Sequence, residues 1–181
     1  MTERIYSGIL PVVPTTFTEI GDLDLESQRR ALDCMVDQGV DGACILANFS
    51  EQFLLTDEER DTLLAESLKH VAGRIPIIVN CSHFSTRIAV ERAKRAEAAG
   101  AAMIMMMPPY HGTALKADEK GIREHFEQIA GAIGIPIMLQ DAPLSGVTLS
   151  IRFLAELLGA IPQVAYFKIE TPGAAAKIRG L

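Results

Sequence analysis

The chain has 181 residues, of which 49% are hydrophobic and 22% are charged, and its formal net charge is −6. This length suits one domain with a sizeable core, and the composition excludes an intrinsically disordered chain. The acidic balance disfavours nucleic acid and anionic lipid as partners. Since no apolar run approaches the roughly 18 residues of a membrane span, and the first residues lack the apolar segment of a signal peptide, we expect a cytoplasmic protein.

The cysteines and histidines do not form a metal or disulfide motif. The three cysteines are an odd number, widely spaced, with no C-x-x-C pair, and the histidines show no H-E-x-x-H spacing. We therefore expect buried, reduced thiols, no metal and no cofactor. The cysteines are Cys34, Cys44 and Cys81.

Six short apolar runs have the pattern of strands. They are nearly continuous in Val, Ile, Leu, Met and Ala, which is typical of strands buried on both faces of a parallel sheet. The predicted strands are Ile9–Pro14, Gly42–Leu46, Ile75–Asn80, Ala102–Met106, Ile135–Leu139 and Val164–Lys168.

Segments with helical periodicity follow each of these runs. Thr56 with Glu59 three residues later has the spacing of a capping box, and several segments end at a glycine suited to a helix C-terminus. The predicted helices are Glu26–Gln38, the segment that opens at Thr56, Thr86–Ala99, Lys116–Ile133, Ser150–Leu158 and Pro172–Arg179.

The predicted strands begin at residues 9, 42, 75, 102, 135 and 164, so one strand-helix unit recurs every 27 to 33 residues. This repeat indicates an α/β fold, either an open doubly wound sheet or a barrel. Short, regular helix-to-strand joins favour a (β/α)8 TIM barrel, and no G-x-G-x-x-G follows the first strand. A closed barrel has eight units in about 250 residues. We therefore expect residues 1–181 to be a single barrel domain with about six units and its C-terminal units missing.

Active sites of parallel barrels lie at the C-terminal ends of the strands, so the polar residues there are the candidates. Lys168 ends the sixth predicted strand, where a lysine is costly to bury. Desolvation favours a neutral amine, which can attack a ketone and form an imine. Two other interpretations of Lys168 are a side chain that extends to the surface or an ion pair with Glu170.

Two other strand ends carry candidate groups. Tyr110 and His111 hold exchangeable protons and could act as acid or base, or could simply pack in a loop. Asn48, Ser50 and the backbone N–H of Phe49 could bind a carboxylate, or could form an ordinary turn.

At these residues the sequence resembles the dihydrodipicolinate synthase and N-acetylneuraminate lyase family of class I aldolases. G-I-L-P-V-V-P-T-T-F resembles the family's first strand, and L-A-N-F-S-E-Q-F-L-L-T-D-E-E-R its G-T-T-G-E loop. M-P-P-Y-H-G, I-M-L-Q-D-A-P and Y-F-K-I-E-T stand where the family has P-P-Y-Y, Y-N-x-P and its Schiff-base lysine. The resemblance implies a barrel, an imine at Lys168, a 2-keto acid substrate and a homodimer or homotetramer.

Several residues differ from the family pattern, and these differences reduce the number of family reactions that the chain could catalyse. Asn48 and Phe49 replace two threonines of the loop, Ser50 replaces a glycine, and Gln140 replaces the tyrosine that shuttles a proton in aldol cleavage. The arginine that follows this motif in the synthase branch is absent, since 144–146 read L-S-G. Glutamine cannot accept and return a proton at neutral pH.

The N-F-S-E-Q loop is most similar to the branch that dehydrates 2-keto-3-deoxy sugar acids, 2-keto-3-deoxy-L-arabonate in particular, to 2-oxoglutarate semialdehyde. In this branch an imine at C2 allows loss of a C3 proton, and the enamine then expels the C4 hydroxyl as water. Tyr110, His111, Ser50 or a water held by Gln140 could protonate that hydroxyl. The alternatives are an aldolase that releases pyruvate, a dihydrodipicolinate synthase-like condensation, and an inactive binding paralogue or fragment.

Overall fold

The computed structural model describes residues 6–111 and 115–181, which divide into two compact units. The first unit comprises Met1–Asn80 and Ala99–Ala102, and the second comprises Cys81–Ala98 and Met103–Leu181. Each unit has its own strands, helices and core, so each is described by itself. The prediction of a single domain over residues 1–181 stays a prediction.

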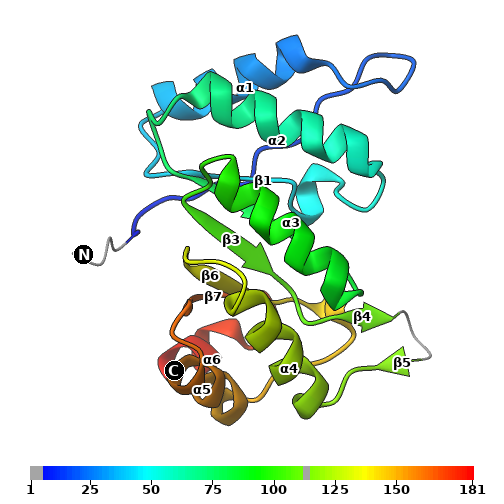
Figure 1. Ribbon diagram of the computed structural model, residues 1–181. Coiled ribbons are helices and arrows are strands. Elements are labelled where there is room, and N and C mark those ends of the chain that lie inside the picture. The colour runs from blue at the N-terminus through cyan, green and yellow to red at the C-terminus, as the bar shows by residue number, and fades with distance from the viewer. Residues whose placement is uncertain (1–5, 112–114) are drawn as a thin grey trace. The chain divides into compact units, whose positions relative to one another are not determined.

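The first unit contains two parallel strands and two helices (Figure 1). Strand β1 (Ala43–Ile45) pairs in parallel with β2 (Ile77–Asn80), and every residue of both strands is buried. Helices α1 (Leu25–Asp37) and α2 (Asp57–Val71) pack against each other. The predicted capping box of α2 is confirmed: the Thr56 hydroxyl accepts from the Glu59 N–H, and the Glu59 carboxylate accepts from the Thr56 N–H.

The predicted first strand, Ile9–Pro14, is wrong as a full strand. It forms one parallel bridge, between Val12 and Cys44, in which the Val13 N–H donates to the Cys44 carbonyl and the Cys44 N–H donates to the Pro11 carbonyl. Pro11 and Pro14 have no N–H, and a ladder cannot continue through residues that lack this donor.

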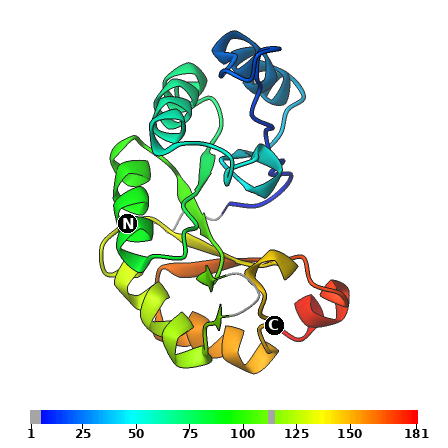
Figure 2. The same cartoon turned by 90° about the vertical axis from the view of Figure 1, so that its right-hand side faces the viewer.

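The second unit contains three parallel strands in the order β3, β6, β7 (Figure 2). These are β3 (Met103–Met106), β6 (Ile137–Asp141) and β7 (Val164–Ile169). Helices α3 (Thr86–Ala98), α4 (Glu119–Ala130), α5 (Ile151–Ala160) and α6 (Ala174–Arg179) alternate with them. The core contains the methionines of β3, which are at most 1% exposed and serve as packing residues.

Several boundaries in the second unit differ from the prediction. Leu115–Lys116 forms strand β5, which pairs in antiparallel fashion with β4 (Tyr110–His111), so α4 begins only after its N-cap Asp118. Helix α4 ends at Ala130 and not at residue 133, and α5 continues through Gly159 to Ala160. Strand β7 is buried only at its first residue, in contrast to the predicted burial on both faces.

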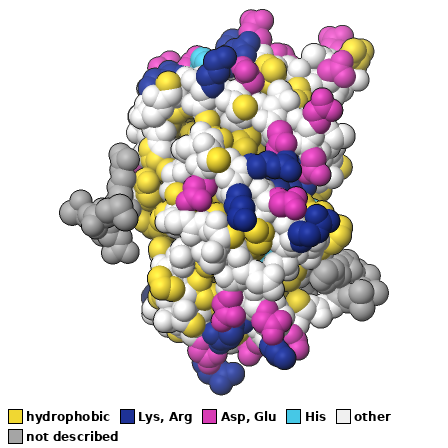
Figure 3. Space-filling model, viewed as in Figure 1, with side chains coloured by type: hydrophobic (Ala, Val, Ile, Leu, Met, Phe, Trp, Pro, Cys, Tyr) yellow, Lys and Arg dark blue, Asp and Glu magenta, His cyan; other side chains and the backbone are white. Residues whose placement is uncertain are grey.

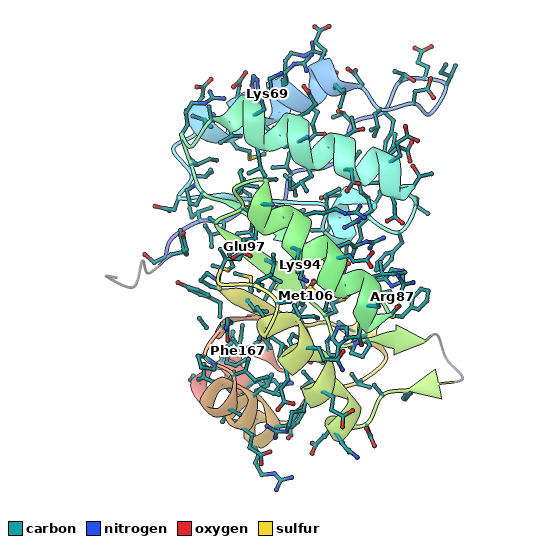
Figure 4. The ribbon with its side chains drawn as sticks, in the orientation of Figure 1. Lys69, Arg87, Lys94, Glu97, Met106 and Phe167 are labelled. Atoms are coloured by element: carbon teal, nitrogen blue, oxygen red, sulfur yellow. The ribbon has the colours of Figure 1, made fainter. Side chains whose placement is uncertain are left out.

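Charged side chains of both signs are interspersed over the face seen in Figure 3. Arg87 and Lys94 of helix α3 are labelled in Figure 4, and both are exposed. Three alanines of the same helix are buried. Glu97 near the end of this helix accepts a hydrogen bond from the Gly134 N–H, at 2.7 Å. No helix in the described part of the chain is long and apolar enough to cross a membrane.

The three cysteines are free thiols. Cys44 and Cys81 are buried, but Cys34 is exposed, so the prediction of burial is wrong for that residue. Cys34 lies on the solvent-facing side of α1, where the helical repeat turns it away from the buried Leu32.

Candidate active site

Lys168, Gln140 and Glu170 form one cluster in the second unit, here called the lysine cluster. Gln140 of β6 is in register with Lys168 of β7. Glu170 follows β7 and contacts both: its Oε1 lies 3.3 Å from the Lys168 Nζ, and its Oε2 accepts from the Gln140 Nε2 at 2.5 Å. A carboxylate thus bridges an amine and an amide at the C-terminal ends of two parallel strands, where sites in such sheets lie.

Burial differs sharply within the lysine cluster. Gln140 is 1% exposed, whereas the side chains of Lys168 and Glu170 are 27% and 31% exposed. The predicted alternative of a Lys168–Glu170 ion pair is therefore observed. This pairing is compatible with imine chemistry, because a carboxylate in contact with the amine is also a base that can accept its proton.

The amide oxygen of Gln140 has no hydrogen-bond partner among the described residues, although it is buried. Most buried polar atoms are hydrogen-bonded, so an orphaned oxygen beside an amine and a carboxylate is a candidate acceptor for a ligand hydroxyl. The Gln140 amide thus donates to Glu170 through its nitrogen, and its oxygen can accept a further hydrogen bond, but an amide cannot shuttle a proton at neutral pH.

Asp141, the neighbour of Gln140 on β6, anchors the surrounding chain. Asp141 is fully buried and forms an ion pair with Lys177 of α6. It also accepts from the Thr171 hydroxyl at 3.2 Å and from the Leu149 N–H at 3.4 Å. Its carboxylate therefore holds three segments around the end of β6.

The loop after β1 carries the predicted carboxylate-binding residues in the first unit. Asn48–Ser50 form a single 3-10 turn, and the residues that flank the loop, Leu46 and Glu51, have φ of 55° and 56°. A non-glycine residue in this left-handed region is strained, above all a bulky one, and such strain is concentrated at functional sites. The loop is therefore held in one shape at some cost in conformational energy.

The Ser50 side chain is a structural donor within this loop. Its hydroxyl donates to the Val13 carbonyl at 2.6 Å, the Thr15 hydroxyl donates to the Ser50 carbonyl at 2.7 Å, and Ser50 is 1% exposed. These two bonds tie the loop to the segment that precedes α1. Ser50 thus contributes rigidity, and its hydroxyl hydrogen is already engaged.

Asn48 and Phe49 have the donors that the loop presents. Phe49 is 78% exposed and lies in the middle of the 3-10 turn. Asn48 is half-buried, and its Oδ1 accepts from the Gln52 Nε2 at 2.9 Å. Backbone N–H groups of a tight turn suit an anionic group such as a carboxylate.

Two predicted residues have only a backbone description. Tyr110 and His111 lie in β4, and their side chains fall outside the described residues. Conversely, sequence reasoning considered Glu170 only as an ion-pair partner. The position of Glu170 beside Lys168 could have been predicted, because residues i and i+2 of an extended strand project on the same face.

The chain is similar in sequence to proteins of one known family. Residues 5–178 match the model of the dihydrodipicolinate synthetase family. The chain is 58% identical over 176 residues to L-2-keto-3-deoxyarabonate dehydratase of Azospirillum brasilense, a match that covers 97% of this chain and 57% of that protein. It is 33% identical to 4-hydroxy-tetrahydrodipicolinate synthase of an Exiguobacterium species, over 84% of this chain and 52% of that protein.

Solved structures show the same fold. The prophage protein YagE of Escherichia coli K12, crystallised with pyruvate, superposes with a TM-score of 0.91 at 29% identity, over 98% of this chain and 58% of that one. The chain thus spans about half the length of the relatives that it matches, and its parallel strands and helices match part of their (β/α)8 barrel. The predicted fold class and family are confirmed: the chain belongs to the dihydrodipicolinate synthetase family.

Proposed function

We propose that this protein is a Schiff-base lyase that removes water from a 2-keto-3-deoxy sugar acid, with 2-keto-3-deoxy-L-arabonate as the substrate and 2-oxoglutarate semialdehyde as the product. The similarity to the Azospirillum dehydratase supports this substrate. The observation that carries the proposal is the lysine cluster, in which Glu170 contacts both Lys168 and Gln140.

The cluster supplies the groups that a dehydration requires. The Lys168 amine condenses with the C2 ketone and releases water, which leaves an imine that acidifies the C3 hydrogens. Glu170 accepts a C3 proton and then donates a proton to the departing C4 hydroxyl, so the second water leaves with the electrons of its C–O bond. The unsaturated product rearranges to the aldehyde. Hydrolysis of the imine then consumes one water, which balances the water released on condensation, and restores the amine of Lys168.

Gln140 favours dehydration over aldol cleavage. Cleavage between C3 and C4 requires a group that takes the proton of the C4 hydroxyl, whereas dehydration requires that this hydroxyl be protonated and leave. An amide oxygen accepts a hydrogen bond but does not carry away a proton at neutral pH. The orphaned Oε1 of Gln140 is suited to orient the C4 hydroxyl toward Glu170.

The remaining features of the site are part of the same proposal. The carboxylate of the substrate binds at the Asn48–Phe49 turn, and Tyr110 and His111 contribute at the mouth of the site. Residues 1–181 belong to a single barrel domain, and the protein functions in the cytoplasm as a homodimer or homotetramer.

Borohydride trapping tests the proposal directly. The protein is incubated with pyruvate, reduced with sodium borohydride, digested and examined by mass spectrometry. We expect a pyruvate-derived mass on Lys168 in the wild type and none in Lys168→Ala. Incubation with 2-keto-3-deoxy-L-arabonate should release the semialdehyde. Release of pyruvate instead would identify the aldolase, and an unlabelled Lys168 in folded protein would support the inactive paralogue.

A further inference from the structure

Arg60 is a buried cation to which the proposed function gives no role. It lies in the first turn of α2 and is only 4% exposed. Its Nη2 donates to the Asn80 carbonyl at the end of β2, at 2.8 Å. Its Nη1 contacts the carbonyl oxygen of Gln52 at 3.3 Å and the side-chain Oε1 of Gln52 at 3.4 Å. Burial of a guanidinium is costly unless its N–H groups are hydrogen-bonded, so the groups that Arg60 contacts indicate its role.

These contacts determine which end of the Gln52 amide and which end of the Asn48 amide donates a hydrogen bond. A guanidinium has only donors, so the end of the Gln52 amide that faces Arg60 must be the oxygen. The Nε2 of Gln52 is therefore the end that donates to Asn48, at 2.9 Å. Asn48 must accept through its Oδ1, which leaves its Nδ2 as the end directed away from Gln52.

The series Arg60, Gln52, Asn48 is here called the amide relay. An amide that can rotate by half a turn offers a ligand either an oxygen or two N–H groups, and only the N–H end is attracted to an anion. We propose that Arg60 is a positioning residue that acts through Gln52 to fix Asn48 as a hydrogen-bond donor to the carboxylate of a 2-keto acid. This inference rests on the proposed function, because that function provides the carboxylate.

The backbone of the loop supports the same role. Leu46 and Glu51 hold the loop in a strained conformation, and Arg60 fixes the residue that follows it through the Gln52 carbonyl. A rigid loop with a defined amide orientation binds an anion without a further ordering cost. The buried cation therefore determines both where the loop lies and which atoms it presents.

Gln52→Glu tests the relay with almost no change in shape. The new carboxylate keeps two acceptors for Arg60 and forms an ion pair with it, so we expect the variant to fold. It has no donor for Asn48, so the Asn48 amide should turn its nitrogen toward position 52 and its oxygen toward the substrate. The pyruvate concentration for half-maximal borohydride labelling of Lys168 should rise about tenfold or more, with little change in the maximal labelling rate.

The controls separate orientation from charge and from folding. Gln128→Glu makes the same charge change at an exposed position of α4 and should leave labelling unaltered. Gln52→Met removes the relay without adding charge and should also raise the half-saturating concentration. Unchanged affinity in both Gln52 variants overturns the relay, as does a loss confined to the maximal rate, which indicates a merely structural role.

A second measurement does not depend on imine formation. In 15N-labelled protein, the side-chain amide signal of Asn48 is assigned by its loss in Asn48→Asp, and lactate is added, which has a carboxylate but no ketone. We expect lactate or pyruvate to shift this signal in the wild type and not in Gln52→Glu at the same concentration. If Lys168 cannot be labelled but these shifts occur, the proposed function fails and the relay stands. An Asn48 signal that responds to neither compound in the wild type overturns the relay.

Discussion

The carboxylate of Glu170 is the residue on which the proposed chemistry depends most. It is the described group that touches both the amine of Lys168 and the amide of Gln140, and it can exchange protons where Gln140 cannot. In the proposed mechanism, Lys168 is the nucleophile, Glu170 the acid-base group and Gln140 the hydrogen-bond acceptor. Each of these roles leaves a different kinetic signature when the residue is changed.

Glu170→Gln should separate imine formation from dehydration. The variant keeps the size of the side chain but cannot take up a C3 proton, so kcat for release of the semialdehyde should fall by about 10²–10⁴-fold. Pyruvate should still be trapped on Lys168 by borohydride. Glu127→Gln, at an exposed position of α4, should leave both measurements unchanged. Full turnover in Glu170→Gln would assign the proton transfer to another group.

Asp33 makes the stability of the first unit depend on pH. Its Oδ1 lies 2.8 Å from the Nη2 of Arg74 and 2.8 Å from the Nε2 of His70. The hydrogen bond from Arg74, followed by the one from His70, lowers the pKa of Asp33 below 3.8. Because the folded state favours the carboxylate, this stabilisation is present above the unfolded pKa and is lost as the pH falls through the folded pKa.

Asp33→Asn should therefore lower the free energy of unfolding at pH 7, and its difference from the wild type should shrink as the pH falls below 3.8. Urea denaturation at several pH values measures this difference. Asp37→Asn, at an exposed position of the same helix, is the matched control and should show a smaller effect. A difference that stays constant down to the lowest pH would contradict the assignment.

At the scale of elements, a buried ion pair joins α6 to β6 in the second unit. The Lys177 side chain is 11% exposed, and its partner Asp141 on β6 is fully buried. Removal of one member of such a pair leaves an uncompensated charge inside the protein, which is more costly than the pair itself is stabilising.

Lys177→Met should lower the free energy of unfolding by about 3–5 kcal/mol. Lys120→Met, on a side chain that is 82% exposed, should change it little. Combination of Lys177→Met with Asp141→Asn should recover part of the loss, because the second change removes the unpaired charge. Equal stability of Lys177→Met and wild type in urea denaturation would show that the ion pair does not hold α6.

Most elements could be predicted from sequence because their signals are local. The capping box at Thr56, and the glycine that follows α1, act through backbone groups within a few residues of each other. The first strand could not be predicted correctly from its apolar run, because Pro11 and Pro14 limit it to one bridge. The β4–β5 hairpin was missed since each strand has only two residues, too few for a periodic pattern.

At the scale of the molecule, the family and the order of strands could be predicted, whereas contacts between distant residues could not. The position of Lys168 at the end of a strand follows from the apolar run before it. The contact of Glu170 with Gln140, 30 residues away, depends on the register of β6 and β7. The amide relay depends in the same way on a turn of α2 that brings Arg60 to the Gln52 side chain.

The net charge of −6 leads to a prediction for the whole chain. Mixed charges on the surface and an overall acidic balance give no continuous positive patch on the face in Figure 3. We expect no change in the fluorescence anisotropy of a labelled DNA duplex when the protein is added at low salt, where nonspecific binding is strongest. A basic DNA-binding protein is the positive control. A salt-sensitive increase in anisotropy would contradict the exclusion of nucleic-acid partners.

The left-handed backbone conformation of Glu51 has opposite effects on thermal stability and on substrate affinity: we expect it to lower the first and to raise the second. Its side chain is exposed, so Glu51→Gly would relieve about 1 kcal/mol of backbone strain without emptying any of the core. The same glycine would give the neighbouring turn more conformations to sample before a carboxylate arrives. A screen for higher melting temperature alone would therefore select a sturdier protein that captures its substrate less well.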